Sequence, residues 1–369
     1  MKIPIIGAYQ TKFGELWDNG INDLIRDAGE NVLRNAGLKP NGIGKLYAAN
    51  AFASKTSGHS LLSSAAYEEL KISNSVLISA GDSSGAAAIH EAANSIMSGE
   101  NDIVMVLGAE KLSDLKTNEL LSLSSGLISM EESLAGATVQ SQFAMITKKY
   151  ANDFKLNARE FSFVPSKNHR NALGNGNAQY RFELSQEKIL SSPVAADPLR
   201  MFDCASYCDG AAALVMCSEK IAKKYKNKVK GYLLASASCS DFLSLSKRKT
   251  IIAFESAIKA GEDALKSASL KRDDIDLMEL HDFAPISEVI AVEDLGFARK
   301  GNGLDYIKNN IARINLSGGL KACGHPLGAT GIRQAADLLK LLKAKRLKYG
   351  LAHTIAGAGS LSVVNIFGV

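Results

Sequence analysis

The chain of 369 residues repeats itself: two segments of the first half return in the second half in the same order. Residues 28–43 (AGENVLRNAGLKPNGI) return as residues 260–275 (AGEDALKSASLKRDDI), with eight of sixteen positions identical. Residues 82–96 (DSSGAAAIHEAANSI) return as residues 325–339 (HPLGATGIRQAADLL), with five of fifteen identical. Self-similarity that keeps its order along the chain indicates a duplicated structural unit. The repeat therefore predicts two similar halves and aligns Asp82 with His325.

Length and composition are those of a globular protein. The chain is 46% hydrophobic and 22% charged, and its length suits about two domains, which we place at residues 1–222 and 223–369. No apolar run approaches the roughly 20 residues of a membrane helix. The amino terminus lacks the charged lead, apolar stretch and cleavage site of a signal peptide. We expect a cytoplasmic protein with no membrane partner.

The cysteine spacing and the net charge argue against several classes of protein. The five cysteines are odd in number and form no CxxC pair, which argues against a disulfide scaffold and a zinc site, so we expect no metal. The net charge of +5 is a weak indication of an anionic ligand. Residues 223–230 are typical of a solvated basic linker, and the lysines of 340–348 are typical of a helix carboxyl end, where the dipole favours cations. We expect no nucleic-acid partner.

Apolar runs and helical patterns alternate along the chain, which predicts an α/β fold with a largely parallel sheet. In the first half the expected strands are 3–8, 46–49, 76–80, 103–107 and 211–217, and the expected helices are 21–36 and 84–98. In the second half the expected strands are 231–238, 275–280, 311–315 and 361–367, and the expected helices are 251–269 and 331–343. Residues 112–199, rich in Ser, Asn and Gly, have no counterpart. A long insertion is usually functional, so we expect a lid over a ligand site rather than an idle surface excursion.

The second repeated pair contains two candidate helix starts. The strand at 76–80 leads through Gly81-Asp82-Ser83-Ser84-Gly85 into a helix with small residues on nearly every face, which predicts burial. A helix amino terminus presents unpaired N–H groups and about half a positive charge, so it stabilises an anion. We therefore expect Asp82 to cap its helix. The second copy has Gly324-His325-Pro326-Leu327-Gly328-Ala329-Thr330-Gly331 at this place.

At this point the chain resembles the thiolase superfamily, in particular the archaeal and sterol-carrier-type thiolases. The resemblance rests on five motifs in order: KNHRN at 167–171, Pro198-Leu199 with DGAAA at 209–213, the His281-Asp282 pair before a helix ending near Gly296, NLSGGLK at 315–321, and GHPLGATG at 324–331. It implies an α-β-α-β-α five-layer fold of two halves, a homodimer or tetramer, and a role in lipid metabolism. It also implies coenzyme A or an acyl-CoA as ligand under the inserted region, with no covalently bound cofactor.

The chain differs from the thiolase superfamily at the position of the catalytic nucleophile. In this family a cysteine at the start of the buried first-half helix attacks a thioester, and histidines supply the base and the oxyanion hole. Here the nucleophile position is Asp82, and the position of the second cysteine is Phe283 or falls in the tail at 353–357. His281 and His325 remain as catalytic candidates. His169, Arg170, Gly324 and Gly357 are the candidate CoA-binding residues that the resemblance implies.

A carboxylate is a poor replacement for a thiolate, because its acyl product would be a reactive mixed anhydride. We therefore expect a CoA-thioester-binding protein without cysteine-dependent acyl transfer. His281 and His325 could still polarise a thioester carbonyl, as a decarboxylase of β-keto or malonyl thioesters requires. Alternatively, the two histidines only satisfy buried groups. Cys323 is a conceivable replacement thiol, although a packing role suits it better.

Two further classes stay open. One is a non-catalytic or scaffolding subunit, because archaeal thiolases of this kind assemble with a hydroxymethylglutaryl-CoA synthase and a small OB-fold/zinc-ribbon protein. The other is a serine hydrolase: Gly81-Asp82-Ser83-Ser84-Gly85 fits the G-x-S-x-G elbow with Ser83 as nucleophile. His59 and His90 are assigned structural roles only.

Overall fold

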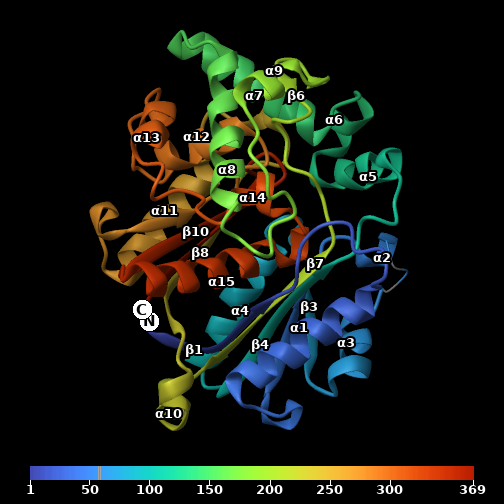
Figure 1. Ribbon diagram of the computed structural model, residues 1–369, viewed down its shortest axis with the longest axis vertical. Helices are drawn as coiled ribbons and strands as arrows, with labels where there is room; N and C mark the ends of the chain where they lie inside the picture. The colour runs from blue at the N-terminus through green and yellow to red at the C-terminus, as the bar shows by residue number, and fades with distance from the viewer. Residues whose placement is uncertain (57, 59) are drawn as a thin grey trace.

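The computed structural model describes residues 1–56, 58 and 60–369. Its main sheet has nine strands in the order β3-β2-β4-β7-β1-β8-β11-β10-β9 (Figure 1). The strands of this sheet are β1 (Ile3–Gln10), β2 (Lys45–Ala49), β3 (Ser75–Ile78), β4 (Ile103–Glu110), β7 (Gly210–Cys217), β8 (Gly231–Ser240), β9 (Leu277–Glu279), β10 (Tyr349–Ala356) and β11 (Leu361–Gly368). β5 (Val194–Ala196) and β6 (Leu199–Arg200) form a small separate sheet.

Helices cover the outer faces of the sheet. Two further helices lie between the strands of the first half of the chain and those of the second half. The helices are α1 (Ile21–Ala36), α2 (Ala53–Thr56), α3 (Leu62–Leu70), α4 (Ser84–Met97), α5 (Thr117–Ser124), α6 (Met130–Leu134), α7 (Val139–Phe154), α8 (Phe163–Ala172), α9 (Gln186–Ser191), α10 (Glu219–Ala222), α11 (Glu255–Ala268), α12 (Pro285–Asp294), α13 (Gly303–Asn309), α14 (Gly319–Cys323) and α15 (Leu327–Lys345). Among the described residues, no helix is both long and apolar enough to cross a membrane.

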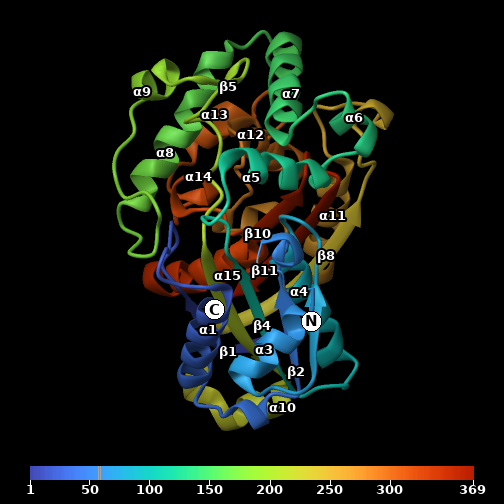
Figure 2. The same ribbon diagram turned by 90° about the vertical axis from the view of Figure 1, so that its right-hand side faces the viewer.

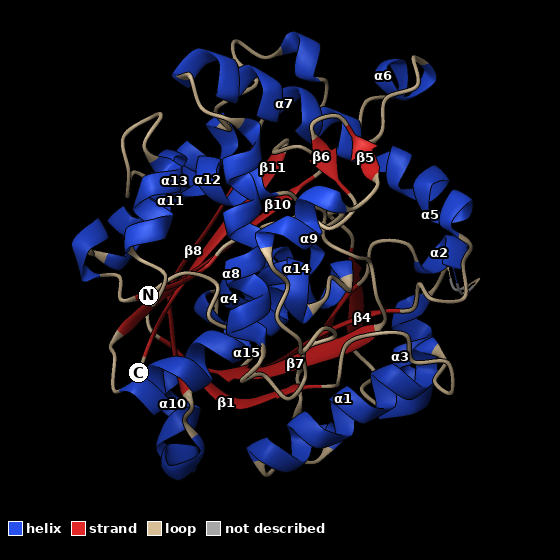
Figure 3. Cartoon of the chain, turned by 45° about the horizontal axis from the view of Figure 1, so that its top comes forward, coloured by secondary structure: helices blue, strands red, loops and turns tan. Residues whose placement is uncertain are grey.

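Three hydrophobic clusters define the layers. One joins α1 and α3 to the outer face of the first-half strands. The second places α4 and α15 between the two halves, against Val106 of β4 on one side and Phe367 of β11 on the other. The third packs α11 and α12 on the outer face of the second half, against Ile366 of β11. Phe367 and Ile366 point to opposite faces because side chains alternate along a strand. The predicted α-β-α-β-α arrangement is confirmed (Figure 3).

The expectation of a largely parallel sheet is wrong. Within the described residues, five of its eight neighbouring strand pairs are antiparallel and three are parallel. The parallel pairs are β2 with β3, β2 with β4, and β9 with β10. β10 and β11 are instead joined by a tight turn, which makes neighbouring strands antiparallel. The alternation of helices and strands predicted the strand pairs that are connected through a helix, which are parallel. It carried no information about strands that are connected directly by a turn.

The second half departs from the predicted elements at two places. Residues 311–315 form no strand, and only an isolated bridge joins Ile314 to Met278. α15 begins at Leu327, four residues before the predicted start. Gly328 and Gly331 lie inside this helix, and a Cβ on either would collide with backbone of the first half. Glycine here allows close helix packing.

The α4–α15 contact positions the site. A Cβ on Gly85 of α4 would lie 2.5 Å from the carbonyl oxygen of Gly328, and one on Gly331 would meet the backbone of Ala86. The two helices therefore approach backbone to backbone, with the repeated segments side by side. This contact brings the turns before α4 and α15 together at the centre of the molecule, as the sequence repeat predicted.

The inserted region, residues 112–199, is a largely helical cap that holds α5 to α9, and Figure 2 shows α5, α6 and α7 above the strands. Phe143 and Tyr150 of α7 are fully buried in the core of the second half. The Tyr150 hydroxyl donates to the Glu293 carboxylate, and Glu132 accepts from the Ser244 hydroxyl at 2.7 Å. The insertion is thus packed structure that joins the two halves.

Candidate active site

Asp82 lies in the tight turn between β3 and α4 and is held by groups of the second half. Only 3% of its surface is exposed. Its Oδ1 lies 3.0 Å from Nε2 of His325, and its Oδ2 accepts a hydrogen bond from the backbone N–H of Gly357 at 3.0 Å. Both carboxylate oxygens are therefore bound, and the predicted juxtaposition of Asp82 and His325 is present.

His325 is fixed in orientation by its two ring nitrogens. It precedes α15, is fully buried, and its Nδ1 lies 2.8 Å from the hydroxyl oxygen of Thr330. Its ring also packs 5.6 Å from the ring of Tyr207. An imidazole with a partner on each nitrogen cannot turn without losing a buried hydrogen bond. His325 is thus pre-organised toward Asp82.

His281 completes the group of ionisable residues. Its ring lies perpendicular to that of His325, with 5.3 Å between centroids, and its Nδ1 is buried without a hydrogen-bond partner. Burial lowers the pKa of His281 well below its usual value, and the neighbouring His325 and His353 lower it further. His281 is therefore a neutral imidazole at physiological pH, able to donate one hydrogen bond.

A buried polar network holds the loop that carries His281. The Asp282 carboxylate accepts from the backbone N–H of Leu320 at 2.6 Å and from Nδ2 of Asn168 at 2.6 Å. Lys167 and Glu288 form an ion pair of 2.9 Å in the same network. These partners come from the inserted region, from α12 and from α14, so they fix the position of the His281 loop relative to the insertion.

Asp82, His281 and His325 are also the group within the described residues that could hold a metal ion. Their potential ligand atoms all lie within 4.8 Å of one another. Two imidazoles and a carboxylate are ligands that divalent transition metals accept. The carboxylate already has hydrogen-bond partners on both oxygens, so Asp82 needs no metal to satisfy its buried charge.

The two helix starts differ from the expected capping. No side-chain cap bond is formed at the start of α4, so Asp82 does not cap its own helix. Glu110 at the end of β4 instead supplies a carboxylate to α15, accepting the N–H of Gly328 at 2.9 Å. It also accepts the N–H groups of Ala51 and Phe52, at 3.0 and 3.1 Å. Burial raises the pKa of Glu110 to about 7.

The cysteines offer no activated thiol at this site. All five are free. Burial raises the pKa of Cys323 to about 12 and that of Cys208 well above its ordinary value. The Cys323 sulfur accepts from Nδ2 of Asn175, 3.5 Å away. Because the thiolate is the nucleophilic form, neither of these two thiols can act as one, and Cys323 fills the packing role considered for it.

The candidate CoA-binding residues lie in different environments. His169 is buried, its Nδ1 lies 3.2 Å from the carbonyl oxygen of Phe182, and burial followed by the charge of Lys321 lowers its pKa to about 4. It is therefore uncharged, whereas Arg170 is exposed. Gly324 has a φ of 111°, and a Cβ there would lie 2.8 Å from the sulfur of Cys208.

Leu127 of the inserted region covers the Asp82 turn. It ends the short helical turn η2 (Ser125–Leu127). A Cβ on Gly81 would lie 2.7 Å from a methyl group of Leu127, and one on Gly357 would collide with the Leu127 carbonyl oxygen. Gly81 and Gly357, with φ of 56° and 57°, thus allow the insertion to rest directly on the site. The role of the insertion as a lid stays a prediction.

The remaining candidates are placed as follows. Ser83 is buried and its hydroxyl has no hydrogen-bond partner, so the proposed elbow has no serine-to-histidine bond among the described residues. Nδ1 of His90 lies 2.9 Å from the hydroxyl oxygen of Ser236 and so links the two halves. His59 lies outside the described residues.

Sequence reasoning missed four residues of this site. Thr330 was part of the GHPLGATG motif, but only its contact with His325 gives it a role. Tyr207 and Glu110 come from strands or loops distant in sequence. His353 is buried with neither nitrogen hydrogen-bonded, and burial lowers its pKa to about 3. No local pattern marks these last three residues.

Comparisons with protein families and with individual relatives agree with each other. Residues 3–220 match the family described as thiolase, N-terminal domain, and residues 237–369 match the thiolase C-terminal domain-like family. The chain is 34% identical to the acetyl-CoA acetyltransferase of Methanothermobacter thermautotrophicus over 99% of both chains. It is 35% identical to that of Methanocaldococcus jannaschii over 99% of this chain and 98% of the relative. Sterol carrier protein 2 of Gallus gallus is 28% identical, and the match covers 99% of this chain and 71% of that protein.

Solved structures agree on the fold. Human mitochondrial 3-ketoacyl-CoA thiolase in complex with CoA superposes with a TM-score of 0.81 at 19% identity, covering 100% of this chain and 98% of the other. An Ltp2-ChsH2(DUF35) aldolase superposes with a TM-score of 0.82, also at 19% identity and with the same coverage. The family matches span nearly the whole chain, and with two relatives above 30% identity they establish that this chain belongs to the thiolase family.

Proposed function

We propose that the protein binds CoA thioesters beneath the inserted region and does not carry out cysteine-dependent acyl transfer. The observation that carries this proposal is the state of Asp82. A carboxylate stands at the start of the buried α4 helix, where the family resemblance implies the nucleophile, and both its oxygens are hydrogen-bonded, to His325 and to Gly357. The CoA complex of a structural relative supports the ligand class.

The chemistry of the site supports the loss of acyl transfer. Attack by a carboxylate on a thioester would give a mixed anhydride, which is far less stable than an acyl-cysteine. In addition, both Asp82 oxygens are hydrogen-bonded, Oδ1 with Nε2 of His325 and Oδ2 with the Gly357 N–H, whereas Nδ1 of His281 has no partner. Cys208 and Cys323 have raised thiol pKa values. The site therefore retains donors for a carbonyl oxygen but lacks an attacking atom.

A thiolysis assay tests this proposal. Purified full-length protein is incubated with acetoacetyl-CoA and CoA, and acetyl-CoA is quantified. We expect no turnover above the uncatalysed rate. Turnover on the order of 1 per second, the low end of ordinary enzyme rates, or an acyl adduct on a wild-type cysteine by intact-protein mass spectrometry, would refute it.

Asp82→Cys provides the complementary test of the site. A thiol at this position lies beside the His325 imidazole, which activates it by accepting its proton. We expect acetyl-CoA to acylate the variant at residue 82, detected by peptide mass spectrometry. Asp82→Ser, of similar size but poorer nucleophilicity, and Asp82→Cys/His325→Ala are the controls and should acquire no adduct. Absence of the adduct from Asp82→Cys would contradict the assignment of this turn as the acyl position.

Decarboxylation of β-keto or malonyl thioesters is the second candidate activity. The observation that favours it is the unpartnered buried Nδ1 of His281 next to the His325 ring, since an enolate oxygen is stabilised by aligned donors without a nucleophile. Release of carbon dioxide from malonyl-CoA, lost in His281→Phe, is the expected result. The assay distinguishes an enzyme from a scaffolding subunit, which would bind acyl-CoA without turnover.

Assembly and the serine alternative have separate tests. We propose a homodimer or tetramer, with a hydroxymethylglutaryl-CoA synthase and a small OB-fold/zinc-ribbon protein as candidate partners. The structural relative Ltp2-ChsH2(DUF35) aldolase, which pairs a similar chain with a DUF35 component, supports partner binding. Light scattering and co-purification test these assignments. Labelling of Ser83 by a fluorophosphonate would favour a hydrolase, whereas the unpaired Ser83 hydroxyl leads us to expect none.

A further inference from the structure

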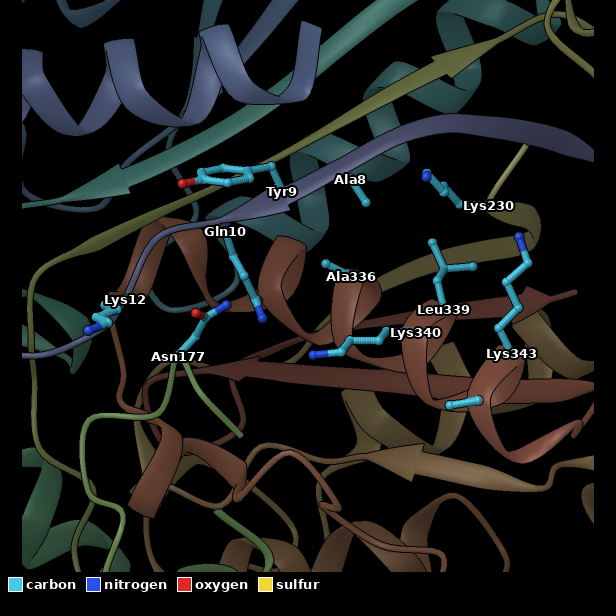
Figure 4. Close-up of a pocket in the computed structure, with 11 residues that line it drawn as sticks. Ala8, Tyr9, Gln10, Lys12, Asn177, Lys230, Ala336, Leu339, Lys340 and Lys343 are labelled. Atoms are coloured by element: carbon cyan, nitrogen blue, oxygen red, sulfur yellow. The ribbon is translucent and has the colours of Figure 1, made fainter. Parts of the chain in front are cut away.

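A cavity lies between β1 and the carboxyl-terminal half of α15, away from the Asp82 site (Figure 4). Its volume is about 900 Å³, within the range of small-molecule sites. The residues that line it are Ala8, Tyr9, Gln10, Lys12, Asn177, Lys230, Ala336, Leu339, Lys340, Lys343 and Ala344. Leu339 is 12 residues beyond the first residue of α15, which corresponds to about 18 Å along the helix axis. We call this cavity the lysine pocket.

The lysine pocket carries uncompensated positive charge. The ammonium groups of Lys12, Lys230 and Lys340 form no ion pair or hydrogen bond in the described part of the chain, and that of Lys343 donates only to the Val229 carbonyl at 3.1 Å. Figure 4 shows these lysines around the rim of the cavity. Four ammonium groups around one hollow repel each other and concentrate anions there.

The acidic groups nearest the pocket already have partners. Asp337 pairs with Arg333 at 3.0 Å and accepts from Nε2 of Gln10 at 2.8 Å. Asp27 accepts from the Tyr9 hydroxyl at 3.3 Å. Asp337 is therefore compensated by Arg333, whereas the exposed Asp27 has no cationic partner in the described part of the chain. The positive charge extends beyond the pocket, because Lys230 and Lys343 also line a neighbouring hollow that contains three further lysines and one acidic residue: Lys2, Lys223, Lys226 and Glu219.

The floor of the pocket is apolar. Ala8, Ala336 and Leu339 contribute methyl groups, and Leu339 is almost completely buried. Nε2 of Gln10, which also lines the pocket, donates to Asp337. A cationic rim above an apolar floor suits a molecule with an anionic head and a compact apolar body, since burial of the body and pairing of the head contribute separately.

We propose that the lysine pocket binds a free amphipathic organic anion, a phosphate or carboxylate with a compact apolar body, at a site separate from Asp82. The position of Lys340 and Lys343 near the carboxyl end of α15 suits the helix dipole, as predicted from the sequence. Lys12, which follows β1, and Lys230, in the loop before β8, line the same cavity and add to its positive charge.

Fluorescence titration of the full-length protein with 8-anilinonaphthalene-1-sulfonate, an amphipathic anion, tests the proposal. Lys340→Glu/Lys343→Glu should weaken dye binding about tenfold, which is about 1.4 kcal/mol. The matched control is Lys39→Glu/Lys116→Glu, which makes the same charge change at two exposed lysines and should bind like wild type. Lys340→Gln/Lys343→Gln covers the case in which the acidic variant does not fold, and should weaken binding about threefold. Asp82→Ala should leave the dye affinity unchanged.

Competition identifies the ligand chemistry. Hexyl phosphate should displace the dye at concentrations at least tenfold below those of inorganic phosphate or 1-hexanol, because it has both parts of the ligand. Equal displacement by hexanol would overturn the role of the lysines, and equal displacement by inorganic phosphate would overturn the role of the apolar floor. Equal dye affinity in the lysine variants and the control would refute the site. If wild type sediments with phosphatidylglycerol vesicles and the lysine variants do not, the pocket binds a lipid surface and the proposal of a free ligand is wrong.

Discussion

The turns before α4 and α15 belong to the two copies of one repeated segment, yet their buried charges are organised differently. At α4 the turn carries its own carboxylate, Asp82, which is bound by His325 and by the Gly357 N–H of the other half. At α15 the turn carries His325, and the carboxylate arrives from β4 as Glu110. Both buried anions thus come from the first half, and the second half supplies hydrogen-bond donors to each.

The comparison separates a carboxylate that binds mainly backbone from one that faces a side chain. Glu110 accepts three backbone N–H groups, including one at the start of α15, so its role is to satisfy the backbone where the halves meet. Among the described residues, Asp82 accepts one backbone N–H group, and it faces an imidazole close to Leu127. The first arrangement is typical of a structural carboxylate that satisfies backbone groups, and the second couples a carboxylate to an imidazole at the proposed ligand site.

The largest effect is expected from Glu110→Ala. Removing the carboxylate leaves the buried N–H groups of Ala51, Phe52 and Gly328 without an acceptor, and each such loss costs about 1 to 3 kcal/mol. We expect the free energy of unfolding in urea to fall by about 4 kcal/mol. Glu30→Ala, at an exposed residue of α1, is the control. A loss below about 1 kcal/mol would show that Glu110 does not hold the halves together.

The pH dependence of Glu110 gives a sharper test of the same role. Its pKa in the folded protein is about 7, against an ordinary value of 4.5. Between these values the folded state keeps a proton that the unfolded chain has released. The contribution of Glu110 to stability is therefore fully present below about pH 4.5 and is lost as the pH rises to about 7, up to about 3 kcal/mol.

Other buried groups titrate in the same pH range. The test must therefore compare the unfolding free energy of wild type with that of a Glu110 variant. Burial also raises the pKa of Glu279 to about 7, whereas it lowers that of His353 to about 3, and these act in opposite directions. Glu110→Gln resembles the protonated carboxyl at every pH. The stability advantage of wild type over Glu110→Gln in urea unfolding should therefore shrink between about pH 5 and pH 7.5. A constant difference would mean that Glu110 titrates normally.

The architecture could be predicted from the sequence better than the strand directions. The duplicated segments correctly placed α4 beside α15 and Asp82 beside His325, because a repeat fixes which segments are equivalent in space. Antiparallel β7 and β11 were missed, because strand periodicity does not depend on the direction of the neighbour. Glu110 was missed for a related reason: its three N–H donors lie far from it in sequence and meet it only through the sheet.

At the other helix start, a double-mutant cycle measures the coupling between Asp82 and His325. Their contact is a buried hydrogen bond of 3.0 Å that involves a charged group, for which a coupling of about 2 kcal/mol is typical. We expect Asp82→Ala and His325→Ala to be non-additive by this amount in urea unfolding near pH 7. Additive effects would show that the two residues are neighbours without a stabilising bond.

Leu127→Ala should have the smallest effect on stability and should separate the two helix starts most directly. Leu127 is half-buried and rests on Gly81 and Gly357, so truncation is expected to cost only about 1 kcal/mol. It should nevertheless expose the Asp82 side of the site, because the side chain that covers Gly81 is removed. Modification of His281 and His325 by diethyl pyrocarbonate, followed by peptide mass spectrometry, should become faster than in wild type.

The control is Leu121→Ala, on the exposed face of α5, which should not change the rate of histidine modification. If the two rates in Leu127→Ala stay at the wild-type value, Leu127 fills space on the surface and the insertion does not control access to the Asp82 and His325 pair.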